Sequence, residues 1–234
     1  MELPPLPVGF SGTRESLHRL AEEVIKPARE QTSGEWTLTE TPGGFGTPVF
    51  GDDCQVRVEG PELVVREQGV ERRAPIGSLA ESAELIGPGL LPEGLGQLPA
   101  EPLQVDPEAC AALAAAYALA REVLERLRSG ALPADSPTAP TLWPEHFDLA
   151  IEMGEEAAGR RANYGLSPGD ENHAEPYLYV GPWSPVAEND LWNASGFGGA
   201  ELGYGTLAAS DDPIRLGIDF SLTRKQALDK ETRT

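Results

Sequence analysis

Residues 142–183, LWPEHFDLAIEMGEEAAGRRANYGLSPGDENHAEPYLYVGPW, contain the pattern from which the fold is best predicted. Apolar and polar side chains alternate from Glu145 to Met153, which is typical of a half-buried strand. A polar turn follows, and residues 163–166 predict a partner strand that ends at the strong turn sequence SPGD (167–170). Residues 175–180 alternate again. We therefore expect three strands paired in an antiparallel sheet.

The clearest predicted helix outside this segment covers about Pro107 to Ser129. Asp106 is suited to cap it, Pro107 takes its first position, and Gly130 follows its end. Apolar side chains recur every three or four positions on one face, as in a helix that packs on a core. These residues are Cys110, Leu113, Tyr117, Ala120, Leu124 and Leu127.

Both ends of the chain predict further helices. The first follows Thr13 and ends or kinks at Pro27, because proline interrupts helical hydrogen bonding. The last is an amphipathic helix with Ile214, Ile218 and Leu222 on its apolar face. Between them, residues 54–58 and 62–66 predict a hairpin, and residues 78–86 a short helix.

These elements predict an α+β fold, with a mainly antiparallel sheet, a long central helix and flanking terminal helices. We expect residues 1–234 to form a single domain. An N-terminal half (1–135) and a C-terminal half (136–234) would share one core.

The chain has a net charge of −20, which disfavours two classes of partner. Nucleic-acid binding needs clustered lysine and arginine, and an anionic membrane surface attracts the same residues. The start, MELPPLP, has no secretory pattern, and the most apolar window (109–120) is shorter than the roughly 20 residues of a membrane span. Cys54 and Cys110 form no metal or redox motif, so two free thiols are expected. We expect a cytoplasmic protein with no nucleic-acid and no membrane partner.

A candidate ligand-binding site lies on the polar side of the three predicted strands. If their apolar sides cover the core, five side chains share the opposite face. These residues are His146, Asp148, Glu175, Tyr177 and Tyr179. A one-residue bulge would exchange the two faces, so this prediction depends on register. His146 and Asp148 are also suited to act as an acid–base pair.

A metal site is the alternative interpretation of this region, since histidines and carboxylates bind Fe(II), Mn or Zn. Its candidate ligands are His146, Asp148, His173 and Glu175. A structural interpretation competes with both sites: His146 and Asp148 would bond to each other and to a loop, while Asp170 caps the turn. The glycine-rich sequence GGFG (43–46) lacks the lysine and the spacing of a phosphate-binding loop and indicates a turn.

LWPEHFDLA (142–150) and YGLSPGDENHAEPYLYV (164–180) together are similar to the signature region of an uncharacterised bacterial domain family of unknown function. In that family, Trp-Pro-x-His-Phe-Asp precedes Ser-Pro-Gly-Asp-Glu and then Glu-Pro-Tyr. The resemblance covers only this part of the chain and brings no activity, substrate or cofactor. His173 lies outside the family pattern, which favours His146 and Asp148 over the metal set.

Three functions remain open from the sequence. The leading hypothesis is a small-molecule-binding or accessory protein that uses the His/Asp/Glu/Tyr strand face. The first alternative is a metal-dependent enzyme at the same face. The second is a structural or protein-interaction module, with Trp183 and Trp192 at an interface.

Overall fold

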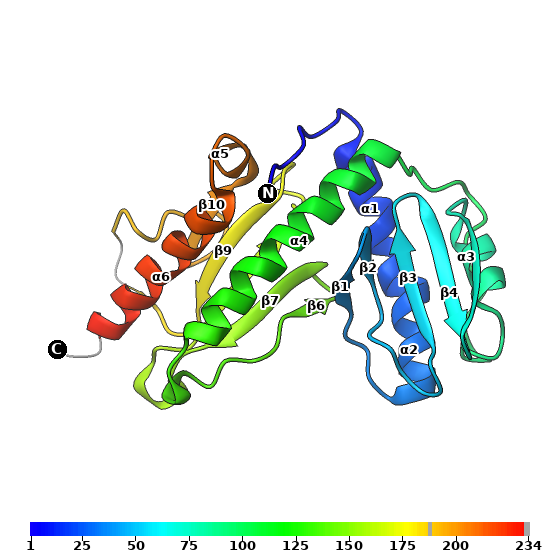
Figure 1. Ribbon diagram of the computed structural model, residues 1–234, viewed down its shortest axis with the longest axis horizontal. Helices are drawn as coiled ribbons and strands as arrows, with labels where there is room; N and C mark the ends of the chain where they lie inside the picture. The colour runs from blue at the N-terminus through cyan, green and yellow to red at the C-terminus, as the bar shows by residue number, and fades with distance from the viewer. Residues whose placement is uncertain (187–188, 232–234) are drawn as a thin grey trace. The chain divides into compact units, whose positions relative to one another are not determined.

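The computed structural model describes residues 1–186 and 189–231, and these form two compact units (Figure 1). The N-terminal unit contains Pro4–Ala118 and Leu142–Phe147. The C-terminal unit contains Met1–Leu3, Leu119–Thr141 and the chain from Asp148 onward. Two five-stranded antiparallel sheets and a long helix confirm the predicted α+β class. The single shared core stays a prediction.

The N-terminal unit is a five-stranded meander with helices, in which each strand pairs with the next along the chain. Its strands are β1 (Thr39–Thr41), β2 (Gly44–Gly46), β3 (Gln55–Glu59), β4 (Glu62–Glu67) and β5 (Val70–Pro75). Its helical segments are α1 (Phe10–Leu20), η1 (Ala21–Ile25), α2 (Lys26–Ser33) and α3 (Leu79–Ile86). The predicted hairpin is confirmed as β3–β4, and the predicted short helix as α3, which Ser78 caps.

The first helix differs from its prediction at both ends. It begins at Phe10, so Thr13 lies inside it, and there the Thr13 hydroxyl accepts a hydrogen bond from the Asp106 amide at 3.0 Å. Pro27 does not end it, because a π-helical turn, η1, comes directly before the proline. A wider turn accommodates the missing N–H and the proline ring. The helix ends at Gly34, whose φ of 72° suits glycine.

One face of the first sheet is apolar and the other is polar, as alternation along the strands requires. The apolar face is buried and consists of Phe45, Val56, Val58, Leu63 and Val65. On the polar face β2 carries only glycines, Gly44 and Gly46. A Cβ at Gly46 would lie 2.4 Å from the Val56 carbonyl oxygen, so this strand must be glycine to approach β3 as closely as it does.

The long helix α4 (Pro107–Gly130) begins in the N-terminal unit and ends in the C-terminal unit. Its predicted cap is confirmed, because Asp106 Oδ1 accepts the amides of Glu108 and Ala109 at 2.8 and 2.9 Å. All the residues of its predicted apolar stripe are buried.

The C-terminal unit contains the second sheet, in the order β10-β9-β8-β7-β6, except for Leu142 and Trp143 of β6, which belong to the N-terminal unit. Its strands are β6 (Thr141–Trp143), β7 (Asp148–Met153), β8 (Ala162–Ser167), β9 (Tyr177–Pro182) and β10 (Ala200–Gly203). Its helical segments are η2 (Pro133–Asp135), η3 (Glu156–Ala158), α5 (Tyr204–Ala208) and α6 (Pro213–Glu231). The three predicted antiparallel strands are confirmed as β7, β8 and β9; β7 is shorter than predicted, β8 is one residue longer at each end, and β9 is shifted by two residues towards the C-terminus.

Phe147 is the reason that β7 begins later than predicted. Its φ of 56° is a turn conformation, which places His146 in the turn before the strand. The Tyr117 hydroxyl donates to the Phe147 carbonyl oxygen at 2.6 Å, and the Phe147 ring stacks on His18 with centroids 5.1 Å apart. The predicted strand from Glu145 was therefore wrong over its first three residues.

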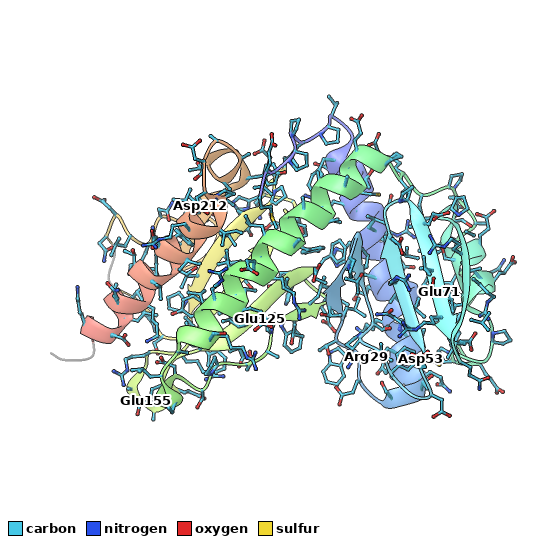
Figure 2. All side chains as sticks on the ribbon, viewed as in Figure 1. Arg29, Asp53, Glu71, Glu125, Glu155 and Asp212 are labelled. Atoms are coloured by element: carbon cyan, nitrogen blue, oxygen red, sulfur yellow. The ribbon has the colours of Figure 1, made fainter. Side chains whose placement is uncertain are left out.

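Helices cover one face of the second sheet. Figure 1 shows α6 and the end of α4 crossing the same side of β7–β9, and a Cβ on Gly217 of α6 would lie 2.8 Å from Leu178 and 3.0 Å from Val123. At the start of α6, Asp212 (labelled in Figure 2) accepts the Arg215 amide at 3.0 Å. The predicted apolar face of this helix was wrong: Leu222 is exposed, and the buried residues are Pro213, Gly217, Phe220, Ser221 and Leu228.

No helix in the described ranges, 1–186 and 189–231, is long and apolar enough to cross a membrane.

Candidate functional site

The face of the second sheet opposite α4 and α6 contains three of the predicted site residues, Asp148, Tyr177 and Tyr179. Strand register puts Gly165, Tyr179 and Glu201 next to one another across β8, β9 and β10, and Asp148 lies on the same face of β7, two residues before the Gly165 partner Ala150. Tyr177 lies two residues before Tyr179 on the same face. Glu175 precedes β9 and is exposed.

A hollow of about 210 Å³ lies at the start of β9. It is lined by His173, Ala174, Glu175, Pro176, Tyr177, Glu201 and Gly203. Three of the predicted site residues, His173, Glu175 and Tyr177, therefore meet at one cavity.

Tyr177 is fixed at this hollow by Asp170. Its side chain is buried, and its hydroxyl donates to Asp170 Oδ2 at 2.9 Å. Burial raises the pKa of Tyr177 to about 12, and the negative charges of Asp170 and Glu201 act in the same direction. The phenol is thus a neutral hydrogen-bonding group throughout the physiological range.

Asp170 also organises the loop that carries His173. Its Oδ1 accepts the backbone amides of Asn172 and His173 at 2.7 and 2.9 Å, a local turn typical of aspartate. Burial alone would raise the pKa of Asp170, but the Asn172 amide, the Tyr177 hydroxyl and His173 together hold that pKa below its ordinary value. The carboxylate stays charged, and the loop is closed around it.

The His173 ring lies between two carboxylates. Nδ1 is 3.2 Å from Asp170 Oδ1, and Nε2 is 3.1 Å from Glu201 Oε2. Both nitrogens donate only when the ring has both of its protons. A neutral ring bonded to Asp170 through Nδ1–H instead presents Nε2 as an acceptor beside Glu201.

Asp148 and Tyr179 form a second pair on the same face. The Tyr179 hydroxyl donates to Asp148 Oδ2, and its ring lies directly over Gly165. Burial, and then the neighbouring Asp148, raises the pKa of Tyr179 well above its ordinary value. The ring centroids of Tyr177 and Tyr179 are 6.4 Å apart, so this pair adjoins the hollow without lining it.

His146 does not lie on the strand face that was predicted for it. It is exposed in the turn before β7 and belongs to the N-terminal unit, whereas the other candidates belong to the C-terminal unit. In the described ranges, no group of three or more His, Cys, Asp or Glu side chains is arranged to hold a metal ion. The proposed ligands His146, Asp148, His173 and Glu175 thus form no such group.

The stretch of sequence that forms the hollow carries negative charges and no lysine or arginine. No lysine or arginine occurs in the sequence between Arg161 and Arg215, which covers β8, β9 and β10. Arg161 bonds to Glu152 at 2.9 Å and lies over the Trp183 ring at 5.2 Å. Trp183 is 48% exposed, and Trp192 is half-buried. The lining of the hollow includes two carboxylates, Glu175 and Glu201, and two rings, His173 and Tyr177, and its described residues include no lysine or arginine.

Glu201 is the functional candidate that the sequence did not reveal. It lies in β10, and only the pairing of Glu201 with Tyr179 brings it to His173. The sequence signal was weak, because a single glutamate follows a glycine-rich segment. Non-local pairing of this kind has no local sequence pattern.

Comparisons of the chain with protein-family models, with curated proteins and with solved structures gave no match in any of the three. The function of the protein is therefore inferred from the geometry of the hollow.

Proposed function

We propose that this protein binds a small amine-bearing cation in the hollow at the start of β9, as a cytoplasmic small-molecule-binding or accessory protein. The observation that supports it most strongly is the convergence of His173, Glu175, Tyr177 and Glu201 on one cavity in a region without lysine or arginine. A bound ammonium group would supply the positive charge that this region lacks.

Each lining group has a role that suits such a ligand. Glu201 and Glu175 accept charge-assisted hydrogen bonds from the ammonium group. The Tyr177 ring offers its negative π-face to a cation. The His173 ring lies between Asp170 and Glu201, and its contacts with both carboxylates fix its orientation beside the ligand.

The size of the hollow limits the ligand. Its volume of about 210 Å³ is below the roughly 300–1,000 Å³ of pockets that hold drug-sized molecules. A short aliphatic amine or diamine fits this limit, and a nucleotide does not.

Calorimetric titration with 1,4-diaminobutane tests the proposal, with butane-1,4-diol and succinate as neutral and anionic probes of similar length. We expect the diamine alone to bind, and we expect Glu201→Gln to weaken it by about tenfold, the usual effect of losing a charge-assisted hydrogen bond. Glu171→Gln is the matched control, because Glu171 is exposed in the same loop and does not line the hollow. Equal binding of diol and diamine, or equal effects of the two variants, would contradict the proposal.

A further inference from the structure

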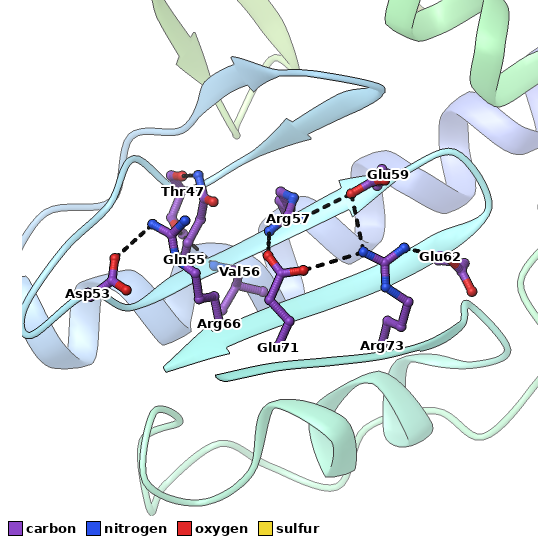
Figure 3. A network of polar contacts seen from close by, with 10 residues as sticks. All are labelled: Thr47, Asp53, Gln55, Val56, Arg57, Glu59, Glu62, Arg66, Glu71 and Arg73. Carbon is purple, nitrogen blue, oxygen red and sulfur yellow. Dashed lines mark hydrogen bonds and ion pairs between the residues drawn. The ribbon is translucent and has the colours of Figure 1, made fainter. Parts of the chain in front are cut away.

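A second hollow lies in the N-terminal unit, on the polar face of the first sheet. Its volume is about 490 Å³. It is lined by Thr41, Pro42, Gly43, Gln55, Arg57, Glu59, Arg66 and Glu71. Thr41, Pro42 and Gly43 contribute one wall, and Figure 3 shows the charged side chains of β3, β4 and β5 on this face.

The centre of this face is a closed network of ion pairs. Arg57 bonds to Glu59 through Nη2 and to Glu71 through Nη1, each at 3.0 Å, and its side chain is 13% exposed (Figure 3). Arg73 extends the network to Glu62. The two terminal nitrogens of Arg57 are thus engaged by protein carboxylates.

Two hydrogen-bond donors at the hollow, Thr41 Oγ1 and Arg66 Nε, are not bonded in this way to a carboxylate of any residue that the structure describes. Thr41 is 5% exposed, and within the described part of the chain its Oγ1 has no hydrogen-bond partner. The buried Nε of Arg66 also has none there, and Arg66 Nη2 bonds to Asp53, whose side chain is 49% exposed, at 2.9 Å. An exposed pair of this kind contributes little and is readily displaced. Buried donors normally have an acceptor, so a ligand oxygen would complete this arrangement.

Charges of opposite sign occupy the two ends of the hollow. Arg66 is paired in register with Gln55, and Glu59 lies four residues further along β3, which corresponds to about 13 Å at the usual strand rise. On this face the neighbouring strand β2 has only Gly44 and Gly46, so no side chain fills the space above it. The hollow is therefore elongated, with Arg66 at one end and Glu59 at the other; Glu59 also pairs with Arg57 and Arg73, both through its Oε2.

We propose that this hollow binds a short zwitterionic peptide. Its C-terminal carboxylate pairs with Arg66, its N-terminal ammonium pairs with Glu59, and the Thr41 hydroxyl donates to a backbone carbonyl oxygen. Glu59 and Glu71 would repel a ligand with two negative charges, and no aromatic side chain lines the hollow to stack on a nucleobase. The site is independent of the amine site in the C-terminal unit.

Calorimetric titration of the full chain with tetraglycine tests the proposal, because this peptide spans about 13 Å when extended. Three probes separate its parts: N-acetyl-tetraglycine lacks the ammonium, tetraglycine amide lacks the carboxylate, and free glycine is too short to reach both ends. We expect tetraglycine to bind and each of the other three to bind about tenfold more weakly or not at all. Absence of binding by tetraglycine, or equal binding of all four probes, would overturn the proposal.

Two variants locate the site. Thr41→Val and Arg66→Gln should each weaken tetraglycine binding by about fivefold or more, whereas Arg19→Gln, an exposed arginine of α1 outside the hollow, should not. Thermal unfolding of every variant shows that it folds. Glu201→Gln should leave tetraglycine binding unchanged, which separates this proposal from the amine site. Folded Thr41 and Arg66 variants that bind normally would place the peptide elsewhere and refute the assignment.

Discussion

The two sheets have the same architecture and opposite chemistry on their polar faces. Each is a five-stranded antiparallel meander. In the first sheet, arginines and glutamates neutralise each other in a network across β3, β4 and β5. In the second, tyrosines and carboxylates bond to each other, and β8, β9 and β10 contain no lysine or arginine.

This difference shows how one scaffold supports two kinds of surface. A balanced ion-pair network satisfies its own charges and responds mainly to salt. A face of phenols and carboxylates leaves negative charge uncompensated and responds to pH and to cations. The second face is therefore the more sensitive one, and the following experiments test this contrast.

The largest effect is expected at alkaline pH and in the C-terminal unit. The folded pKa values of Tyr177 and Tyr204 are raised to about 12, mainly by burial, from an ordinary value of 10.0. The unfolded chain therefore loses these protons first, so stability falls as pH rises from 10 towards 12. We expect circular dichroism and phenolate absorbance to change together in this window. Phenolate formation without loss of structure would contradict this expectation.

Two matched glycine substitutions compare the rigidity of the faces. A Cβ at Gly46 would lie 2.5 Å from Arg57 Cβ and even closer to the β3 backbone, so Gly46→Ala should destabilise by about 3 kcal/mol. A Cβ at Gly165 meets only the Tyr179 ring, at 2.8 Å, which can tilt away at the cost of its Asp148 bond. We expect Gly165→Ala to lower the free energy of unfolding, measured with urea, by about 1.5 kcal/mol. The reverse order would mean that the second face is the more rigid.

Acid titration distinguishes the carboxylates of the two faces. The pKa of Asp170 is held below its ordinary value of 3.8. Asp170 therefore contributes its full stabilisation of the fold above pH 3.8, and this stabilisation is lost as pH falls through the folded pKa. Asp170→Asn should lower the free energy of unfolding at neutral pH by about 1 kcal/mol, allowing for solvent screening. It should also make the free energy of unfolding depend less on pH in the acidic range. Glu71→Gln should change the curve less, because Glu71 is at the surface and Glu59 also binds Arg57 and Arg73. Urea unfolding across acidic pH measures both, and a larger effect of Glu71→Gln would be contradictory.

The smallest effect is expected on the helix-covered face of the second sheet. Tyr164 is buried in β8, and within the described residues its hydroxyl has no hydrogen-bond partner. Tyr164→Phe should thus change stability by less than about 0.5 kcal/mol, whereas Tyr177→Phe, which removes the bond to Asp170, should cost about 1 kcal/mol. Equal losses in thermal unfolding would indicate that Tyr164 has a bound water or another partner.

Elements with local sequence signals were predicted well. The cap at Asp106, the stripe of α4 and the β3–β4 hairpin all depend on residues close together in sequence. Such signals survive folding because the same short contacts form in the native state. The order of β7, β8 and β9 was predictable for a similar reason, since these strands follow one another in the chain and turn-forming segments, 154–161 and 168–176, join them.

The failures have a different physical origin. The helix was expected to end or kink at Pro27; it does not end there, because a π-helical turn before the proline changes the local geometry. His146 was expected on the site face, but the positive φ of Phe147 turns the chain, and its buried ring and its bond to Tyr117 hold that conformation. Glu201 reached the hollow only through pairing of β10 with β9. In each case a tertiary contact decided what the local pattern left open.

Helix α4 has a consequence for how this protein can be divided. Its first part belongs to the N-terminal unit and its second part to the C-terminal unit, and the chain later returns Leu142–Phe147 to the N-terminal unit. Fragments ending near residue 118 would lack Phe147, whose carbonyl oxygen binds Tyr117. No single cleavage therefore yields both units intact, and a genetic exchange must carry two separate pieces of coding sequence for the N-terminal unit or three for the C-terminal unit.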